Sequence, residues 1–330
     1  IIFFLFFFIY SKKKKFKTKF LIFDIIKCFI IFYLSLLFFW IDAYQNLIIL
    51  PFTFLMSTLT DTYWTGWNYN LVNGKYYFSN DVGKSYLISN IFYKMPEYII
   101  FLYLIFALKF KNTFFLKKFK KYNYKIIFIF LILSFPNIII FIAPYSIYDG
   151  LRLFLWVIPY ICILPALILY YLIYSHKDFI NKIYLFFLLV LFVFFLTDFF
   201  KLTPYQYTYL NLFNGKKDHL YHKFENDYWG TSLQELVKKS NFDKDKELSF
   251  SICGISETLS KKYLKKKYKK AVFVKLKDAK YIIMTNRTTG KIDNPKEKRE
   301  LTNCFKKHKG NNLFEVKRNN QILSVIRKLK

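Results

Sequence analysis

Four residues at 148–152 form a short polar corner, Tyr148, Asp149, Gly150 and Arg152, between two apolar runs. Each run is long enough to cross a bilayer, whose hydrocarbon core needs about 20 apolar residues. A carboxylate and a guanidinium are costly to keep where membrane helices meet water, unless they have a partner or a function. An arginine suits a phosphate, because its guanidinium can donate two parallel hydrogen bonds. We expect Tyr148, Asp149 and Arg152 to bind substrate; the alternative, that Asp149 and Arg152 only pair with each other, stays open.

A second group of candidate binding residues follows the last apolar run. The segment FENDYWGTS, residues 224–232, brings Glu225, Asp227, Tyr228 and Trp229 together before an expected helix. Aromatic rings beside carboxylates are typical of sugar binding, because a ring covers an apolar sugar face and a carboxylate accepts hydrogen bonds from hydroxyl groups. These four residues are therefore predicted to contact a substrate. The alternative, that the segment only packs the C-terminal domain against the membrane part, stays open.

The composition indicates an integral membrane protein with an appended domain. The chain has 330 residues, of which 55% are hydrophobic and 23% aromatic. A soluble domain would have about 45–50% apolar residues, and the excess lies in the first 200 residues.

The charge of the chain is strongly basic. Lys and Arg outnumber Asp and Glu by 51 to 21, which gives a formal net charge of +30. Such a charge can indicate nucleic-acid binding. However, Lys, Ile, Phe, Asn and Tyr are abundant together, as AT-rich coding produces, and basic segments flank the apolar runs. We therefore expect no nucleic-acid partner and expect contact with anionic lipid headgroups.

The apolar runs predict an α-helical, polytopic membrane domain over residues 1–200, with a long aromatic loop at 41–95. The chain opens inside an apolar run, without the charged region and cleavage site of a signal peptide. Residues 1–10 are therefore interpreted as the end of a severed membrane helix, and the chain as the C-terminal part of a longer protein. Five complete spans are expected at 20–40, 96–108 with a start near Ile91, 126–142, 153–174 and 183–200.

The distribution of lysines predicts the orientation in the membrane. Segments 11–19, 109–125 and 175–182 carry lysines, whereas 41–95 and 144–152 are poor in Lys and Arg. The positive-inside rule places the lysine-bearing loops in the cytoplasm. We therefore predict a multi-pass protein of the cytoplasmic membrane whose aromatic loop, polar corner and C-terminal domain lie outside.

Residues 201–330 are predicted to form a small extracytoplasmic α/β domain. Ser232 and Glu235 have capping-box spacing and predict a helix through about Lys239. Cys253 and Cys304 lie where oxidation is permitted, and the sequence leaves open whether they form a disulfide. Strands are expected at Leu248–Cys253, Ala271–Val274 and Tyr281–Thr285, a helix at Glu257–Tyr268, and a hairpin at Glu315–Arg318 and Gln321–Arg327.

The sequence identifies no cofactor and no metal ligands. The four cysteines have no zinc-site spacing, and the four histidines form no ligand cluster. A requirement for a divalent metal stays open, as does the oligomeric state.

Several segments, in order, carry a resemblance to one family: LVNGKYYFSND, YLISNIFYKMPEYIIFL, YDGLR, PYQYTYLNLFNG and FENDYWGTSLQELVKK. From about Gly66 onward the chain resembles the C-terminal half of bacterial multi-pass glycosyltransferases. These belong to the GT-C superfamily and are related to the dolichyl-phosphate-mannose protein mannosyltransferases of family 39. The resemblance implies an inverting transferase of the cell envelope. Such an enzyme would pass a sugar from a polyprenyl-phosphate donor to a glycan, lipid or protein acceptor.

The resemblance also implies roles for single residues. In that superfamily the catalytic acid lies in the first outer loop and acts as general base on the acceptor hydroxyl. That loop would lie upstream of this chain, so the catalytic residue is unknown. By position, Arg152 is expected near the donor phosphate, with Tyr148 and Asp149 shaping the same cleft. Two positions depart from the pattern, because Leu153 stands where a His is expected and Gly83 where a Pro is expected.

Two other functions stay open. A transporter or flippase of a lipid-linked substrate would be expected to show inverted repeats and polar residues near the middle of the membrane. Here the polar residues gather at one surface, which favours transfer chemistry. A non-catalytic membrane anchor with an outer binding domain is the third alternative.

Overall fold

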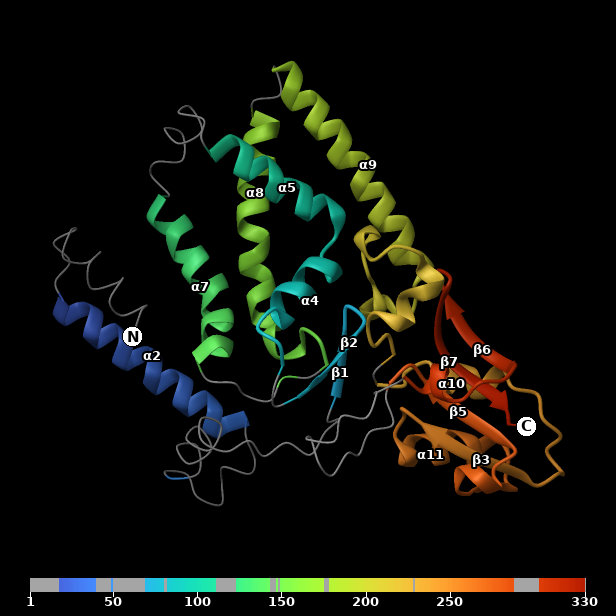
Figure 1. Cartoon of the computed structure of the whole chain (residues 1–330). Helices are drawn as coiled ribbons and strands as arrows, with labels where there is room; N and C mark the ends of the chain where they lie inside the picture. Colours follow the sequence, from blue (N-terminus) through green and yellow to red (C-terminus); the bar gives the residue numbers. More distant parts are fainter. Residues whose placement is uncertain are drawn as a thin grey trace. The chain divides into compact units, whose positions relative to one another are not determined.

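The computed structural model of the protein describes residues 18–39, 49, 69–79, 82–110, 123–142, 147, 149–174, 178–227, 229–287 and 303–329 (Figure 1). The chain divides into two compact units, Ile1–Trp64 and Thr65–Lys330. The first unit contains α2 (Thr18–Phe39), a helix at the first predicted complete span. Its described apolar side chains are exposed, with Phe29 at 65% and Phe38 at 73%. Such a surface is expected of a helix that faces lipid.

In the second unit, helices occupy the positions of the remaining predicted spans. Those of residues 152–174 and 179–201 are long and apolar enough to cross a membrane. The other three predicted complete spans stay predictions. The helices concerned are α5 (Glu97–Phe110), α7 (Asn123–Ile142), η3 (Arg152–Val157) with α8 (Ile158–Tyr174), and α9 (Phe179–Lys201).

The expected span near 91–108 is not one continuous helix. The chain forms α4 (Tyr86–Lys94) and then α5, and these two helices meet at an angle of 110°. Pro96 explains the break, because proline lacks an N–H donor and keeps the preceding residue, Met95, out of the helical conformation. Met95 is indeed extended, with φ −80° and ψ 138°. The helix expected from near Ile91 to Leu108 is therefore interrupted at Pro96, and whether the bent pair crosses a membrane as one span stays a prediction.

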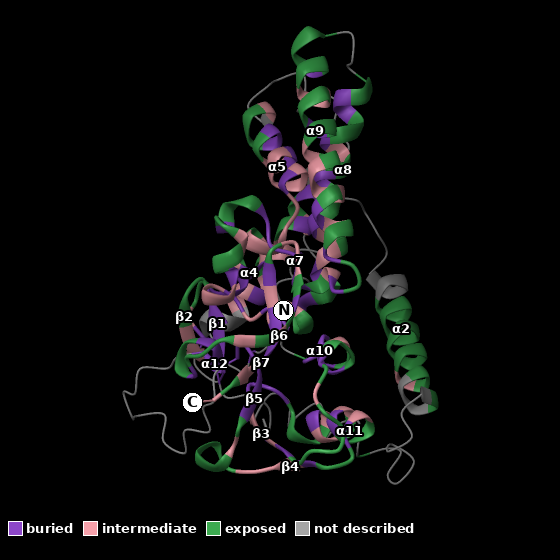
Figure 2. Cartoon of the chain, turned by 90° about the vertical axis from the view of Figure 1, so that its right-hand side faces the viewer, coloured by how far each residue is buried: buried purple, intermediate pink, exposed green. Residues whose placement is uncertain are grey.

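The helices of the second unit pack through apolar side chains. Leu102 and Ile105 of α5 lie with Leu164 and Ile168 of α8 in one buried cluster, which Leu188 of α9 joins. Figure 2 shows that much of the outer surface of α9 is exposed. This combination of a buried seam and an apolar outer surface is what a membrane helix bundle requires.

The C-terminal part of the chain folds into a five-stranded mixed sheet in the order β4-β3-β5-β7-β6. β3 pairs in parallel with both β4 and β5, and β7 runs antiparallel to both of its neighbours, β5 and β6. All predicted strands and the hairpin are present. The strands are β3 (Leu248–Cys253), β4 (Ala271–Phe273), β5 (Tyr281–Thr285), β6 (Asn312–Arg318) and β7 (Gln321–Lys328).

Helices cover both faces of this sheet. Side chains of α10 (Leu233–Lys239) and α11 (Glu257–Lys267) pack with Phe250 and Ile283. On the opposite face, α12 (Cys304–Lys307) packs with Ile282 and Met284. The alternation along β5 is the period of two that a strand buried on both faces requires.

The predicted capping box of α10 is wrong, although the helix begins at the predicted place. Ser232 precedes α10, but its hydroxyl makes no bond to the helix backbone. Its Oγ contacts Asp227 and Ser324 instead. Glu235 accepts hydrogen bonds from Tyr205 and Arg318. Both side chains are therefore used in tertiary contacts, and tertiary contacts override a local capping pattern.

Buried polar contacts tie the helices to the chain that follows α9. Glu97, at the start of α5, accepts hydrogen bonds from the Tyr209 hydroxyl (2.7 Å) and the Leu212 amide (2.8 Å). Asp198, near the end of α9, pairs with Lys217 (2.5 Å), which also reaches Asn319 (3.1 Å). These contacts fix the C-terminal domain to the helix ends.

A disulfide joins Cys253, the last residue of β3, to Cys304, the first residue of α12. We expect Cys253→Ser to lower the free energy of unfolding by about 2–4 kcal/mol, because the cross-link restricts the unfolded chain. Thermal unfolding of the detergent-solubilised protein with and without reductant measures this change. Cys162→Ser, which alters a free thiol of α8, is the control. An unfolding temperature of the wild-type protein that is the same with and without reductant would contradict the expectation.

Candidate functional site

The polar corner is a tight turn held by two neighbouring elements. Asp149 and Gly150 have positive φ angles of 55° and 67°. The Asp149 amide donates to Asn70 Oδ1 (3.2 Å), and Asn70 Nδ2 donates to the Ile147 carbonyl (2.8 Å). The Gly150 amide donates to the Tyr86 hydroxyl (3.1 Å). A hairpin of β1 (Tyr69–Val72) and β2 (Lys75–Phe78) and the start of α4 thus fix the backbone of the corner.

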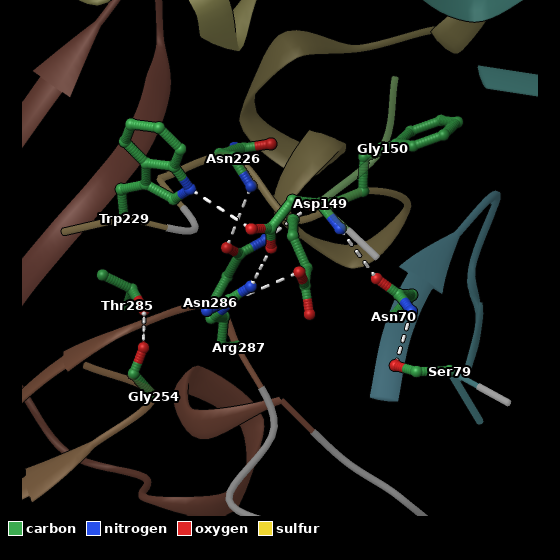
Figure 3. Close-up of polar contacts among 12 residues, drawn as sticks. Asn70, Ser79, Asp149, Gly150, Asn226, Trp229, Gly254, Thr285, Asn286 and Arg287 are labelled. Atoms are coloured by element: carbon green, nitrogen blue, oxygen red, sulfur yellow. Dashed lines mark hydrogen bonds and ion pairs between the residues drawn. The ribbon is translucent and has the colours of Figure 1, made fainter. Parts of the chain in front are cut away.

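The Asp149 carboxylate is the centre of the site (Figure 3). Its Oδ1 accepts a hydrogen bond from Arg287 Nη2 at 2.5 Å. Its Oδ2 accepts bonds from Arg152 Nη1 at 3.4 Å and from Trp229 Nε1 at 3.2 Å. Asp149 is 8% exposed. The structure therefore brings together residues from the corner, from the 224–232 segment and from the chain after β5.

Arg152 is the exposed cation of this group. Its side chain is 47% exposed, and its guanidinium lies 4.9 Å from the ring centroid of Trp229. A guanidinium at this distance from an indole ring is attracted to the π-system. Leu155 and Trp156, which follow in η3, are 62% and 48% exposed. An oriented cation and exposed apolar side chains thus lie at the beginning of a helix that can cross a membrane.

Glu225 lines a small cavity behind the corner. Its Oε2 accepts a hydrogen bond from Arg287 Nε at 3.3 Å. Among the described residues, neither Glu225 Oε1 nor Asn90 Oδ1 has a hydrogen-bond partner. Both residues line a cavity of about 10 Å³, together with Lys94 and Gly150. Such a space holds about one water molecule, which can satisfy these two oxygens.

Gly150 and Lys94 fit closely in this cavity. A Cβ atom at position 150 would lie 2.3 Å from Lys94 Nζ and 3.4 Å from Asn90 Oδ1. Any other residue at this position would therefore push the ammonium away, in addition to straining the positive φ angle. The positive φ angle favours glycine at this position, and the Lys94 side chain would have to move to admit a larger residue.

Asp227 lies in a different environment. It is fully buried, and its carboxylate accepts hydrogen bonds from the Thr231 amide (2.8 Å) and the Ser232 amide (2.9 Å). It also bonds to the Tyr207 and Ser232 hydroxyls. These contacts order the turn before α10, as an N-cap side chain does. This geometry favours a structural role, and substrate binding by Asp227 stays a prediction.

Two of the predicted binding residues, Tyr148 and Tyr228, lie outside the described residues. Sequence reasoning missed Arg287. Arg287 directly follows a strand of five buried residues and one buried asparagine. The available signal was a cation just beyond the end of an apolar strand, because side chains from neighbouring strands lie close together at the end of a sheet.

Among the described residues, no group of three or more His, Cys, Asp and Glu side chains could hold a metal ion. No protein-family model, curated protein or solved structure matches the chain. The fold and the site geometry therefore carry the functional argument, and the family resemblance stays a prediction.

The burial of Glu225 predicts how stability depends on pH. Burial raises the pKa of this carboxyl above its ordinary value of 4.5, and the Asp149 charge adds to the rise, whereas Arg287 and Lys94 oppose it. A folded-state pKa above the unfolded value stabilises the fold fully below the unfolded pKa, and this contribution is lost as pH rises through the folded pKa. Because glutamine resembles the neutral acid, the stability of Glu225→Gln relative to wild type should increase with pH above 4.5.

Thermal unfolding of both proteins from about pH 4 to pH 7 measures this difference. Glu257→Gln, at an exposed position of α11, is the matched control. A difference that shrinks as pH rises would mean that Arg287 stabilises the ionised carboxylate enough to outweigh its burial.

Proposed function

We propose that the protein is a glycosyltransferase that moves a sugar from a polyprenyl-phosphate carrier to an acceptor at the outer face of the cytoplasmic membrane. The observation that carries this proposal is the exposed Arg152 guanidinium, oriented by Asp149 and Trp229 at the first residue of an apolar helix. A lipid-linked phosphate lies at the boundary between acyl chains and water. A fixed guanidinium at this boundary matches the phosphate in charge and in hydrogen-bond geometry.

In this reaction the acceptor oxygen attacks the anomeric carbon of the sugar while the bond to the phosphate oxygen breaks, with inversion. Arg152 would bind the phosphate and stabilise the charge that develops on it as it leaves. A polyprenyl phosphate is already a good leaving group, so no covalent intermediate is needed. The proton of the acceptor would pass to a general base. We do not assign this role to Asp149, because both of its carboxylate oxygens already accept hydrogen bonds, from Arg287, Arg152 and Trp229.

Sugar binding would use the residues beside the phosphate site. The Trp229 side chain is 53% exposed and donates to the Asp149 carboxylate. An exposed indole next to a carboxylate suits a sugar, because the ring can cover apolar C–H groups. Glu225 is buried behind Asp149, and we propose that it supports this site through Arg287. A glycan, a lipid or a protein could provide the acceptor hydroxyl.

The proposed location rests on two observations. The disulfide between Cys253 and Cys304 supports an oxidising compartment for the C-terminal domain. The alternation of lysine-rich and lysine-poor loops also supports a C-terminal domain on the outer side of the membrane. We propose that α2, α5, α7, η3 with α8, and α9 are the five spans of this topology.

Arg152→Ala tests the proposed phosphate contact. We expect the KM for a polyprenyl-phosphate sugar to rise about 10–100-fold, since a charge-assisted hydrogen bond contributes about 1.5–3 kcal/mol. The KM of Arg152→Lys should lie between those of Arg152→Ala and wild type, because lysine keeps the positive charge but cannot donate two parallel hydrogen bonds. Transfer of radiolabelled sugar in membranes that contain the complete gene product measures this effect.

Arg318→Ala is the matched control, because it removes another arginine–carboxylate contact, with Glu235, away from the corner. An unchanged donor KM and kcat in Arg152→Ala would refute the phosphate contact. If correctly inserted wild-type protein transferred no sugar from any donor, a flippase assay with the same lipids would be the next measurement.

A further inference from the structure

Arg287 is a buried cation of the site that binds two carboxylates from distant parts of the chain. It is 2% exposed. Its Nη2 donates to Asp149 Oδ1 at 2.5 Å, and its Nε donates to Glu225 Oε2 at 3.3 Å. Burying a guanidinium is costly unless it is paired in good geometry. Arg287 is therefore fixed by its contacts and fixes the groups that it contacts.

The backbone that carries Arg287 is itself held at several points. The Cys304 amide donates to the Arg287 carbonyl at 2.9 Å, and Cys304 is bonded to Cys253 at the end of β3. The Asn286 side chain donates to the Phe224 carbonyl at 2.6 Å. The Thr285 hydroxyl donates to the Gly254 carbonyl at 2.7 Å. The disulfide and these bonds place the arginine relative to the sheet and to the 224–232 segment.

The two oxygens of Asp149 face different partners. Arg287 contacts Oδ1, and both Arg152 and Trp229 contact Oδ2. A carboxylate bound through one oxygen by a buried arginine cannot rotate about its side-chain bonds without breaking that contact. Oδ2 is thereby kept towards Arg152, whose long side chain would otherwise sample many conformations at the surface.

We propose that Arg287 is a positioning residue of the donor site: by holding Asp149, it keeps Arg152 oriented to bind the lipid phosphate. This inference rests on the proposed function, whose phosphate contact it deepens. It also gives the disulfide a role in substrate binding, because the disulfide anchors the chain that carries Arg287. Lysine cannot replace Arg287 fully, since a single ammonium lacks the rigid fork that reaches both carboxylates.

A double-mutant cycle tests this role. Arg287→Lys, Arg152→Ala and the double variant are compared with wild type in lipid nanodiscs, and the affinity for decaprenyl phosphate is measured. We expect Arg287→Lys to weaken binding about tenfold in the wild-type background and to have little further effect when Arg152 is already alanine. Arg318→Lys, which alters the contact with Glu235 away from the corner, should leave the affinity unchanged in both backgrounds.

An equal loss of affinity from Arg287→Lys in both backgrounds would overturn the proposal, because the arginine would then act independently of Arg152. If Arg287→Lys does not fold, Cys253→Ser replaces it in the same cycle. The expected result is then a smaller loss that again disappears in the Arg152→Ala background.

Tryptophan emission distinguishes a failure of this inference from a failure of the proposed function. The Trp229 signal is obtained by subtracting the spectrum of Trp229→Phe, and it reports on the indole that contacts Asp149 and Arg152. We expect Arg287→Lys to shift this signal and Arg318→Lys to leave it unchanged. An unshifted signal would refute the positioning role. A wild-type protein that binds no decaprenyl phosphate would refute the proposed donor site, and a shifted signal would still support the role of Arg287 in orienting the corner.

Discussion

The structure around the corner depends on one buried ion pair, between the Asp149 carboxylate and the Arg287 guanidinium. Removing a carboxylate from water costs several kcal/mol unless hydrogen bonds and opposite charges replace the solvent. Asp149 receives three such donors, from Arg287, Arg152 and Trp229. Breaking such a buried pair by removing one partner costs about 3–5 kcal/mol, because it leaves an uncompensated charge. The corner, the 224–232 segment and the end of β5 therefore stabilise one another.

Polar groups converge at the ends of the two helices, 152–174 and 179–201, that are long and apolar enough to cross a membrane. Inside the bilayer, helices bury apolar side chains against one another and expose apolar side chains to lipid. Charged groups are tolerated at the helix ends, where they can pair or reach water. The pairs of Asp198 with Lys217 and of Asp149 with Arg152 both lie at such ends. The same physical constraint that assembles the C-terminal domain on the helix ends thus also provides an oriented cation at the proposed lipid boundary.

The sequence was informative wherever local pattern decides structure. Apolar runs predicted the helices, and the strands of the C-terminal domain lie within one residue of the ranges predicted at Leu248–Cys253, Ala271–Val274 and Tyr281–Thr285. The chemistry expected at Asp149, Arg152, Glu225 and Trp229 identified residues that the structure brings together. Contacts between residues far apart in the sequence could not be predicted. Arg287 lies 138 positions from Asp149, and no local sequence pattern indicates that they pair.

Local patterns also failed where tertiary contacts compete with them. Ser232 and Glu235 have capping-box spacing, but partners elsewhere in the fold take both side chains. The apolar run around Pro96 reads as one span, although proline geometry divides it into two helices. Hydropathy identifies apolar segments, but it does not show where the chain bends within such a segment.

Photo-cross-linking tests directly whether the corner binds a lipid-linked phosphate. A polyprenyl phosphate with a photoreactive group next to the phosphate would be irradiated with the protein in membranes, and the labelled peptides would be identified by mass spectrometry. We expect labelling of the peptides that contain Arg152 and Trp229, and competition by unlabelled polyprenyl phosphate. Labelling confined to other segments, or labelling that the competitor does not reduce, would contradict this expectation.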